Sequence, residues 1–117
     1  MASPFSFFGS QESAMYKVSV MYPNEPGARF DLDYYLTRHM DLVREHLKPF
    51  GLIKTDVDQG ISGGGADPAP FVCIGNLYFE TPDGYDRGIA EAGPILRGDI
   101  PNFTTIKPIR QISQVLE

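Results

Sequence analysis

The segment from residue 31 to residue 47 constrains the fold most, because it carries the strongest periodic pattern in the chain. Side chains that are apolar or carry a ring recur along it at steps of three and four, as on the buried face of a helix. They are Leu32, Tyr35, Leu36, His39, Leu42, Val43, His46 and Leu47. Asp31 is suited to cap the N-terminus, and Lys48, Pro49 and Gly51 end the helix. We expect one long helix that packs against a sheet.

Four runs of apolar or alternating residues predict strands around this helix. They cover residues 17–22, 52–59, 71–79 and 105–115. The third run is almost continuously apolar, which is typical of a strand buried on both faces. Pro108 in the last run indicates an edge strand or a bulge, since proline donates no ladder hydrogen bond.

A second helix is expected to begin with Thr81 as its cap and to end at Gly93 and Pro94. The following residues, 94–104, are expected to be irregular, with a turn around Asp99. The resulting order β-α-β-β-α-β predicts an α+β, ferredoxin-like fold with a four-stranded antiparallel sheet and both helices on one face.

This pattern predicts a single domain over residues 16–117, preceded by a flexible arm over residues 1–15. The third strand is apolar on both sides, with Phe71, Cys73, Leu77 and Phe79 on one and Val72, Ile74 and Tyr78 on the other, so a monomer would expose one of these rows. An apolar face of this kind indicates an interface. We therefore expect a homodimer whose two sheets pack face to face and close a barrel between the subunits.

Charge and cysteine content exclude several functions. The net charge is -5 and the ten basic residues are scattered, which argues against binding nucleic acid or an anionic membrane. No apolar stretch approaches membrane-spanning length. Cys73, the single cysteine, has no internal partner and no neighbouring cation, so we expect a buried strand residue and a reducing, cytoplasmic location. Residues 60–70 have four glycines but lack the Lys-Ser/Thr of a phosphate-binding loop.

His39 is the candidate catalytic residue, because the helical period turns its imidazole toward the sheet, one turn after Tyr35. The alternative is a packed histidine, which is the expectation for His46. Tyr34 is expected to face away. Small residues at 88 and 92 of the second helix leave room for a small hydrophobic ligand. The candidate ligand-binding residues are Tyr22, Tyr35, Phe79 and Tyr85.

No metal or other cofactor is expected. His39 and His46 are seven positions apart, too far for two ligands from one helix, and neither has a second ligand at the fourth following position. Asp99 is expected to form a turn.

Several fragments in order resemble one family. They are Tyr22-Pro23-Asn24, Phe30-Asp31, Tyr34-Tyr35, His39 with Leu42, Gly51, Phe79, Asp99 with Thr104, and Pro108 with Gln111-Ile112-Ser113. Together they resemble the EthD family, named for ethyl tert-butyl ether degradation. The resemblance implies the dimeric α+β barrel, whose superfamily includes cofactor-free monooxygenases, lactone isomerases and polyketide cyclases and dehydratases. His39 matches the family's characteristic histidine.

Three functions follow as hypotheses. The first is a small cofactor-independent enzyme of catabolism or secondary metabolism, acting on an apolar oxygenated molecule, aromatic or lactone-like. His39 would move a proton in an isomerisation, dehydration or cyclisation. The second is a non-catalytic accessory or small-molecule-binding protein that supports an oxygenase pathway such as ether degradation. The third is a purely structural homodimer whose cavity is filled by side chains.

Overall fold

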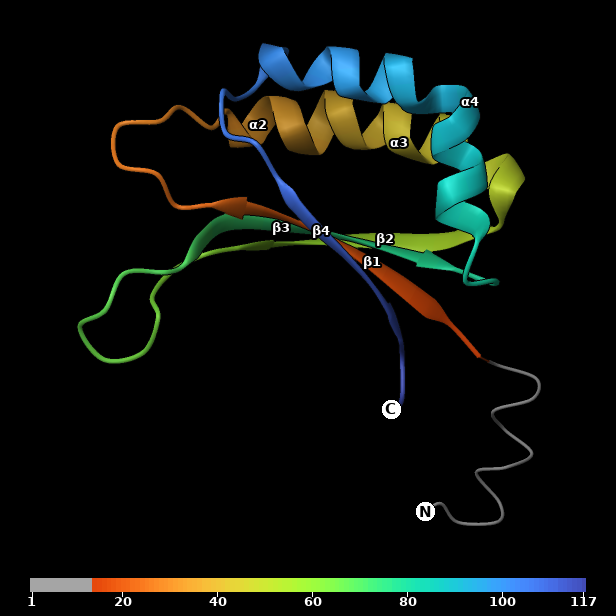
Figure 1. Cartoon of the computed structure of the whole chain (residues 1–117). Coiled ribbons are helices and arrows are strands. Elements are labelled where there is room, and N and C mark those ends of the chain that lie inside the picture. The colour runs from red at the N-terminus through yellow and green to blue at the C-terminus, as the bar shows by residue number, and fades with distance from the viewer. Residues whose placement is uncertain (1–13) are drawn as a thin grey trace.

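A computed structural model of the chain describes residues 14–117, so most of the expected arm over residues 1–15 lies outside the described part. Its four strands are β1 (Tyr16–Pro23), β2 (Leu52–Gln59), β3 (Phe71–Phe79) and β4 (Ile109–Gln114). They form one sheet in the order β2-β3-β1-β4, and every neighbouring pair is antiparallel (Figure 1). The predicted sheet is therefore confirmed, with β4 at an edge.

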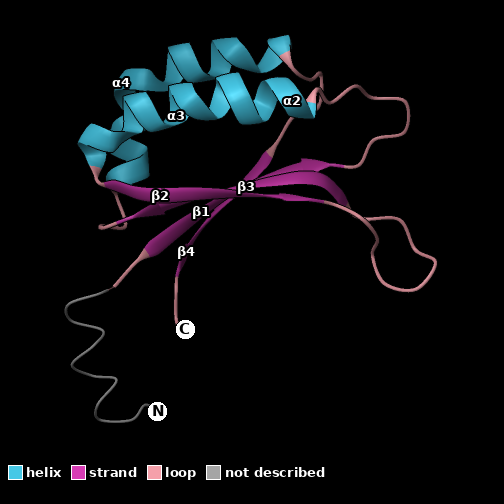
Figure 2. Ribbon diagram, turned by 180° about the vertical axis from the view of Figure 1, so that it is seen from behind, coloured by secondary structure: helices cyan, strands magenta, loops and turns pink. Residues whose placement is uncertain are grey.

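Both long helices cover the same face of this sheet (Figure 2). Along the chain, the helical segments are α2 (Leu32–Tyr34), a π turn η1 (Tyr35–His39), α3 (Met40–Leu47), a 3-10 turn η2 (Lys48–Phe50), α4 (Gly84–Asp99) and a 3-10 turn η3 (Ile100–Asn102). The first three are consecutive and form one continuous rod, the long helix that the sequence predicts. The arrangement confirms the α+β, ferredoxin-like fold. Within residues 14–117, no helix is long and apolar enough to cross a membrane.

The first helix begins as predicted but is not regular. The Asp31 side chain accepts a hydrogen bond from the backbone N–H of Tyr34, at 3.1 Å, and so caps the helix. The backbone N–H of Met40 then bonds the carbonyl of Tyr35, five residues back, which defines the π turn. This wider turn changes the phase of the inner stripe. Leu36, expected on the inner stripe, is 45% exposed.

The second helix does not end at Gly93 and Pro94, contrary to prediction, but continues to Asp99. Proline clashes with the side chain of the residue before it, and glycine has none, so the helical conformation survives at this position. Figure 1 shows that α4 is bent, so that its second part runs along α3. The extension matters because it carries Asp99 to the start of the first helix.

The last strand is shorter than predicted and begins only after Pro108. Just before it, Phe103 and Thr104 pair with the segment that leads into the first helix. The carbonyl of Phe103 accepts from the backbone N–H of Asp31, and Thr104 forms a bridge with Phe30. The Thr104 hydroxyl also donates to the carbonyl of Arg29, at 2.6 Å. These bonds place Phe103 beside the N-terminal end of the first helix.

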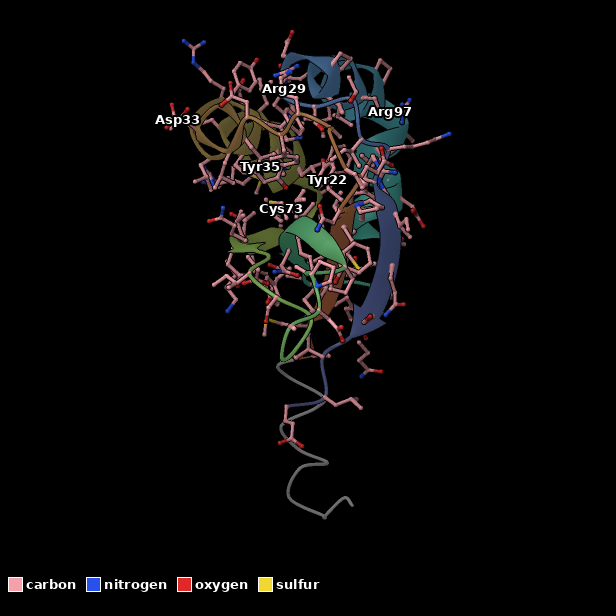
Figure 3. The ribbon with its side chains drawn as sticks, turned by 90° about the vertical axis from the view of Figure 1, so that its left-hand side faces the viewer. Tyr22, Arg29, Asp33, Tyr35, Cys73 and Arg97 are labelled. Atoms are coloured by element: carbon pink, nitrogen blue, oxygen red, sulfur yellow. The ribbon has the colours of Figure 1, made fainter. Side chains whose placement is uncertain are left out.

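The core lies between the helices and the sheet. Tyr35 enters it from the helical layer, whereas Tyr22 and Cys73 enter it from neighbouring positions of β1 and β3 (Figure 3). Phe103 is fully buried and packs against Tyr22 and Tyr35, with ring centroids 5.9 and 5.1 Å away. Aromatic packing therefore joins the two layers at this end of the domain.

The opposite face of the sheet is bare in the described part of the chain (Figures 1 and 2). Register places Met21 beside Ile74 and Ile109 on this face, and it places Ser19 beside Asn76 and Gln111. Asn76 is buried and donates to Asp56 and Asp58 on β2, at 2.8 and 3.0 Å. The face is therefore mixed, with a polar row across an apolar surface.

Candidate functional site

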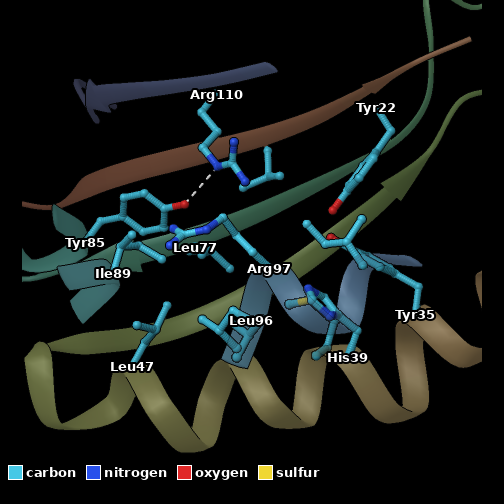
Figure 4. A pocket seen from close by; sticks show the side chains of 14 residues that line it. Tyr22, Tyr35, His39, Leu47, Leu77, Tyr85, Ile89, Leu96, Arg97 and Arg110 are labelled. Atoms are coloured by element: carbon cyan, nitrogen blue, oxygen red, sulfur yellow. Dashed lines mark hydrogen bonds between the residues drawn. The ribbon is translucent and has the colours of Figure 1, made fainter. Parts of the chain in front are cut away.

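A cavity of about 220 Å³ lies between the helices and the sheet. Most of its wall is apolar, with polar atoms supplied by tyrosine, histidine and arginine side chains (Figure 4). The volume lies below the roughly 300–1,000 Å³ of sites for drug-sized ligands, so a small molecule would fit. His39, Tyr22, Tyr35 and Tyr85 all line it. Phe79 does not, but lies buried under Tyr85 with ring centroids 6.1 Å apart.

His39 and Asp99 form a buried pair in the wall of this cavity. His39 Nδ1 lies 2.9 Å from Asp99 Oδ2, and the two side chains are only 7% and 9% exposed. His39 ends the π turn of the first helix, and Asp99 is the last residue of α4. Turn formation, the role preferred for Asp99 from the sequence, is not what the structure shows, because the continuation of α4 brings its carboxylate to the imidazole.

Two further side chains hold the Asp99 carboxylate. The Tyr34 hydroxyl donates to Oδ1 at 2.6 Å, and Asn102 Nδ2 donates to the same oxygen at 3.0 Å. The sequence predicts that Tyr34 faces away from the sheet, and Tyr34 does not line the cavity, but its hydroxyl still reaches the site through Asp99. The residue lies on the side of the helix that meets the end of α4, where its ring stacks on Phe103. The carboxylate is therefore fixed on both of its oxygens.

The imidazole is also held by the rings around it. Tyr35 stacks on His39 with a centroid distance of 5.5 Å and an interplanar angle of 19°, and Phe103 lies 4.7 Å away. The π turn sets the spacing of Tyr35 and His39 along the helix. Turns of this kind occur frequently at functional sites. Here the turn presents both rings to the same cavity.

The charges of the pair follow from its surroundings. Burial lowers the pKa of His39 below 6.5, although Asp99 opposes the shift, so the imidazole is neutral at pH 7. Burial acts to raise the pKa of Asp99, but the hydrogen bonds from Tyr34, Asn102 and His39 outweigh it and lower the pKa below 3.8. The same bond to Asp99 raises the pKa of Tyr34. The neutral imidazole therefore donates its Nδ1 proton to a charged carboxylate.

This arrangement leaves Nε2 of His39 with a lone pair for a ligand. No hydrogen bond joins Nε2 to another described residue. Within residues 14–117, no buried side-chain nitrogen or oxygen lacks a hydrogen-bond partner, so Nε2 must have accessible surface. His39 is one of the residues that line the cavity, so a ligand there lies beside its ring. The site thus has the form of an oriented general base.

Tyr22 and Tyr35 supply hydroxyl groups to the same wall. Burial is the main cause that raises the pKa of both phenols well above 10, so each keeps its proton. Their mutual hydrogen bond raises the pKa of Tyr35 and lowers that of Tyr22, so Tyr35 is the donor and the Tyr22 proton is left for a ligand oxygen. The Tyr35 hydroxyl lies directly over Gly75 of β3, where any side chain would collide with it. Gly75 therefore creates the space that Tyr35 occupies.

Two arginines complete the lining, and neither is among the residues that the sequence pattern predicts for the site. Arg110 on β4 is opposite Val20 and so turns toward the helices, and its Nε donates to the Tyr85 hydroxyl at 3.0 Å. Arg97 reaches the cavity from α4 (Figure 4). The alternation of β4 is the sequence signal for Arg110. Arg97 is missed because the sequence predicts that the helix ends at Pro94, before this residue.

Other sequence candidates lie outside the cavity. His46 lies in a shallow groove between α3 and α4 with Glu45 and Glu91. Burial raises the pKa of the Cys73 thiol to about 12, so it is not a nucleophile at neutral pH. No cluster of three or more metal-binding side chains occurs among residues 14–117.

Comparison with known proteins identifies relatives of this fold. An EthD-like protein from Ralstonia eutropha is 35% identical, with a TM-score of 0.83, over 90% of this chain and 95% of that one. An EthD family protein from Bacillus halodurans is 19% identical, with a TM-score of 0.66, over 87% and 99%. A dimeric ferredoxin-like protein from an uncultured marine organism is 16% identical, with a TM-score of 0.55, over 90% and 96%. No family model and no curated protein matches the chain.

The fold and cavity define a ferredoxin-like protein with a site between its helices and its sheet. The 35% identity to the Ralstonia protein over nearly its whole length goes further. The chain belongs to the EthD family.

The lowered pKa of His39 predicts acid sensitivity of the fold. The unfolded chain binds a proton at histidine near pH 6.5, whereas folded His39 binds it only at lower pH. The contribution of His39 is therefore complete above about pH 6.5 and is lost as the pH falls below it. We expect the urea midpoint to fall between about pH 7 and pH 5, and to fall less in His39→Gln. If the urea midpoint falls equally steeply with pH in the wild type and in His39→Gln, this account is contradicted.

The contact between Gly75 and Tyr35 predicts a rescue. Gly75→Ala should lower the free energy of unfolding by about 1–3 kcal/mol, because the new methyl group meets the Tyr35 hydroxyl. Tyr35→Phe removes that hydroxyl, so the double variant should lose less than the sum of the two single variants. Urea unfolding of the four proteins measures the coupling, and simple additivity would show that the contact is not the cause.

Proposed function

We propose that this protein is a cofactor-independent enzyme in which His39 transfers a proton to or from a small oxygenated substrate. The observation that carries the proposal is the buried Asp99–His39 pair in the wall of a largely apolar cavity, with Nε2 of His39 left without a partner among the described residues. A carboxylate behind the imidazole fixes its tautomer and stabilises the imidazolium that forms when Nε2 takes a proton. Neutral tyrosines beside it favour an oxygenated ligand.

The reaction class follows from the proton balance. Nε2 removes a proton from a carbon next to a carbonyl group, and the electron pair of the C–H bond moves to form an enolate. The Tyr22 hydroxyl, which accepts from Tyr35, would donate to the enolate oxygen. The imidazolium returns the proton to another carbon in an isomerisation, or to a departing hydroxyl group in a dehydration. Neither path needs an oxidant. An aromatic or lactone-like ketone has the size and polarity that the cavity requires.

Hydrogen exchange in D₂O tests this proposal even though the natural substrate is unidentified. The protein is incubated with a panel of small aromatic ketones and lactones, and the loss of the α-proton NMR signals is followed. We expect accelerated exchange for at least one compound and a decrease of about 10²–10⁴-fold in His39→Gln, the typical contribution of a general base. His46→Gln is the matched control, because His46 lies outside the cavity.

Asp99→Asn separates orientation of the base from simple packing. The variant keeps the shape of the side chain but removes its charge, so exchange should slow and its pH profile should move. Exchange that is equally fast in wild type and His39→Gln would refute the enzymatic proposal. Chemical-shift changes that show ligand binding, without exchange of the α-protons, would favour the second candidate. This candidate is a binding or accessory protein of an oxygenase pathway such as ether degradation. The apolar cavity also suits that role.

The bare sheet face supports a homodimer as the working form. Met21, Ile74 and Ile109 lie together on it, and Asn76 adds a buried polar group. A related fold is described as dimeric. We expect the mass of a dimer in light scattering at micromolar concentration, and a monomer for Ile74→Asp, which would bury a charge at the interface. Ile95→Asp is the control, because Ile95 is exposed on α4. A monomeric wild type would contradict the proposal.

A further inference from the structure

Two guanidinium groups share the cavity with His39, and no carboxylate accompanies them there. The lining contains Arg97 and Arg110 but no Asp or Glu. Among residues 14–117, the only ion pairs are His39 with Asp99, Arg44 with Asp41 and Arg87 with Asp83. Arg97 and Arg110 therefore have no acidic partner in the described part of the chain.

The fold directs both arginines toward this space. Arg97 folds back over Gly93, and its guanidinium lies 2.6 Å from where a Cβ atom of that residue would be. Any other residue at position 93 would push the guanidinium away. Arg110 points to the helices by strand alternation, and its Nε is held by the Tyr85 hydroxyl. Figure 4 shows the two side chains reaching the same cavity from α4 and β4, and because both residues are exposed they lie at its mouth.

The free donors of this group match a carboxylate. With Nε bonded to Tyr85, both terminal nitrogens of Arg110 remain available. The fork geometry of a guanidinium binds two carboxylate oxygens at once. Tyr85 accepts from Arg110, so its own hydroxyl proton is still available to a ligand. Arg97 could simply stabilise the C-terminal end of the α4 dipole, and Arg110 could simply protect the edge strand β4 from pairing. Neither of these structural roles requires the side chain to line the cavity.

We infer that the ligand of this cavity is an organic acid, whose carboxylate binds Arg97 and Arg110 while its apolar body lies under the helices toward His39. This inference rests on the proposed function in that it uses the same cavity. It adds a charge to the ligand and a second anchoring point. The carboxylate would fix the molecule so that a single carbon is presented to Nε2.

Benzoate and benzamide test the inference as a matched pair of probes, since they share a shape and differ in charge. Binding to the full-length protein is measured by NMR titration and calorimetry. We expect benzoate to bind at least tenfold more tightly than benzamide, because charge-assisted hydrogen bonds replace neutral ones. Arg97→Gln and Arg110→Gln should each weaken benzoate about tenfold and leave benzamide unchanged.

Arg87→Gln is the control on the same helix. It changes the net charge by the same amount, but Arg87 pairs with Asp83 outside the cavity. Equal binding of the two probes by the wild type, or an equal effect of Arg87→Gln, would overturn the inference. So would unchanged benzoate affinity in both cavity variants. The circular dichroism spectrum of each variant is the check that it is folded.

The result of the benzoate and benzamide test does not depend on catalysis. His39→Gln should still prefer benzoate, because it leaves both arginines in place. If no compound exchanges protons but benzoate binds through the arginines, the ligand class stands and the enzymatic proposal fails. If neutral ketones exchange protons while the protein binds benzoate and benzamide equally, the enzymatic proposal stands and the organic-acid inference fails.

Discussion

The hydrogen bond between His39 and Asp99 is the interaction on which the site depends. It joins residues 60 positions apart and ties the π turn of the first helix to the last residue of the second. The bond fixes the tautomer of the imidazole, and His39 itself lines the cavity. Loss of either partner would leave a buried polar group unpaired, which is costly in a medium of low polarity. Tyr34 and Asn102 protect the pair by satisfying the second carboxylate oxygen.

Local patterns predict most of the fold and half of the site. Strand alternation predicts the bounds of β2 and β3, and the helical period turns His39 inward. The prediction fails at Pro94, because a glycine before proline removes the clash that normally ends a helix. The misplacement of Asp99 follows from that error. Tyr34 is missed because a π turn has no clear signature in composition, and because contacts across 60 residues leave no trace in a local period.

The distribution of charge adds information that the fold does not. A ferredoxin-like fold serves many unrelated functions, so membership of the EthD family by itself specifies no reaction. The chain as a whole is acidic and would repel an anion at long range. Its cavity nevertheless contains one neutral base and two protonated phenols, and two unpaired cations lie at its mouth. Selection among small molecules would then arise inside the cavity and not at the surface.

The π turn allows the two ends of the first helix to fit different neighbours. In a regular helix, the direction of every side chain is determined by that of the first, so Tyr34 and Val43 could not be adjusted separately. One wider turn between them removes that coupling. The N-terminal part faces Phe103 and the end of α4, while the C-terminal part follows the sheet. Deletion of a single residue between 35 and 39 would restore a regular helix of the same secondary structure, yet the two halves would no longer match their partners together.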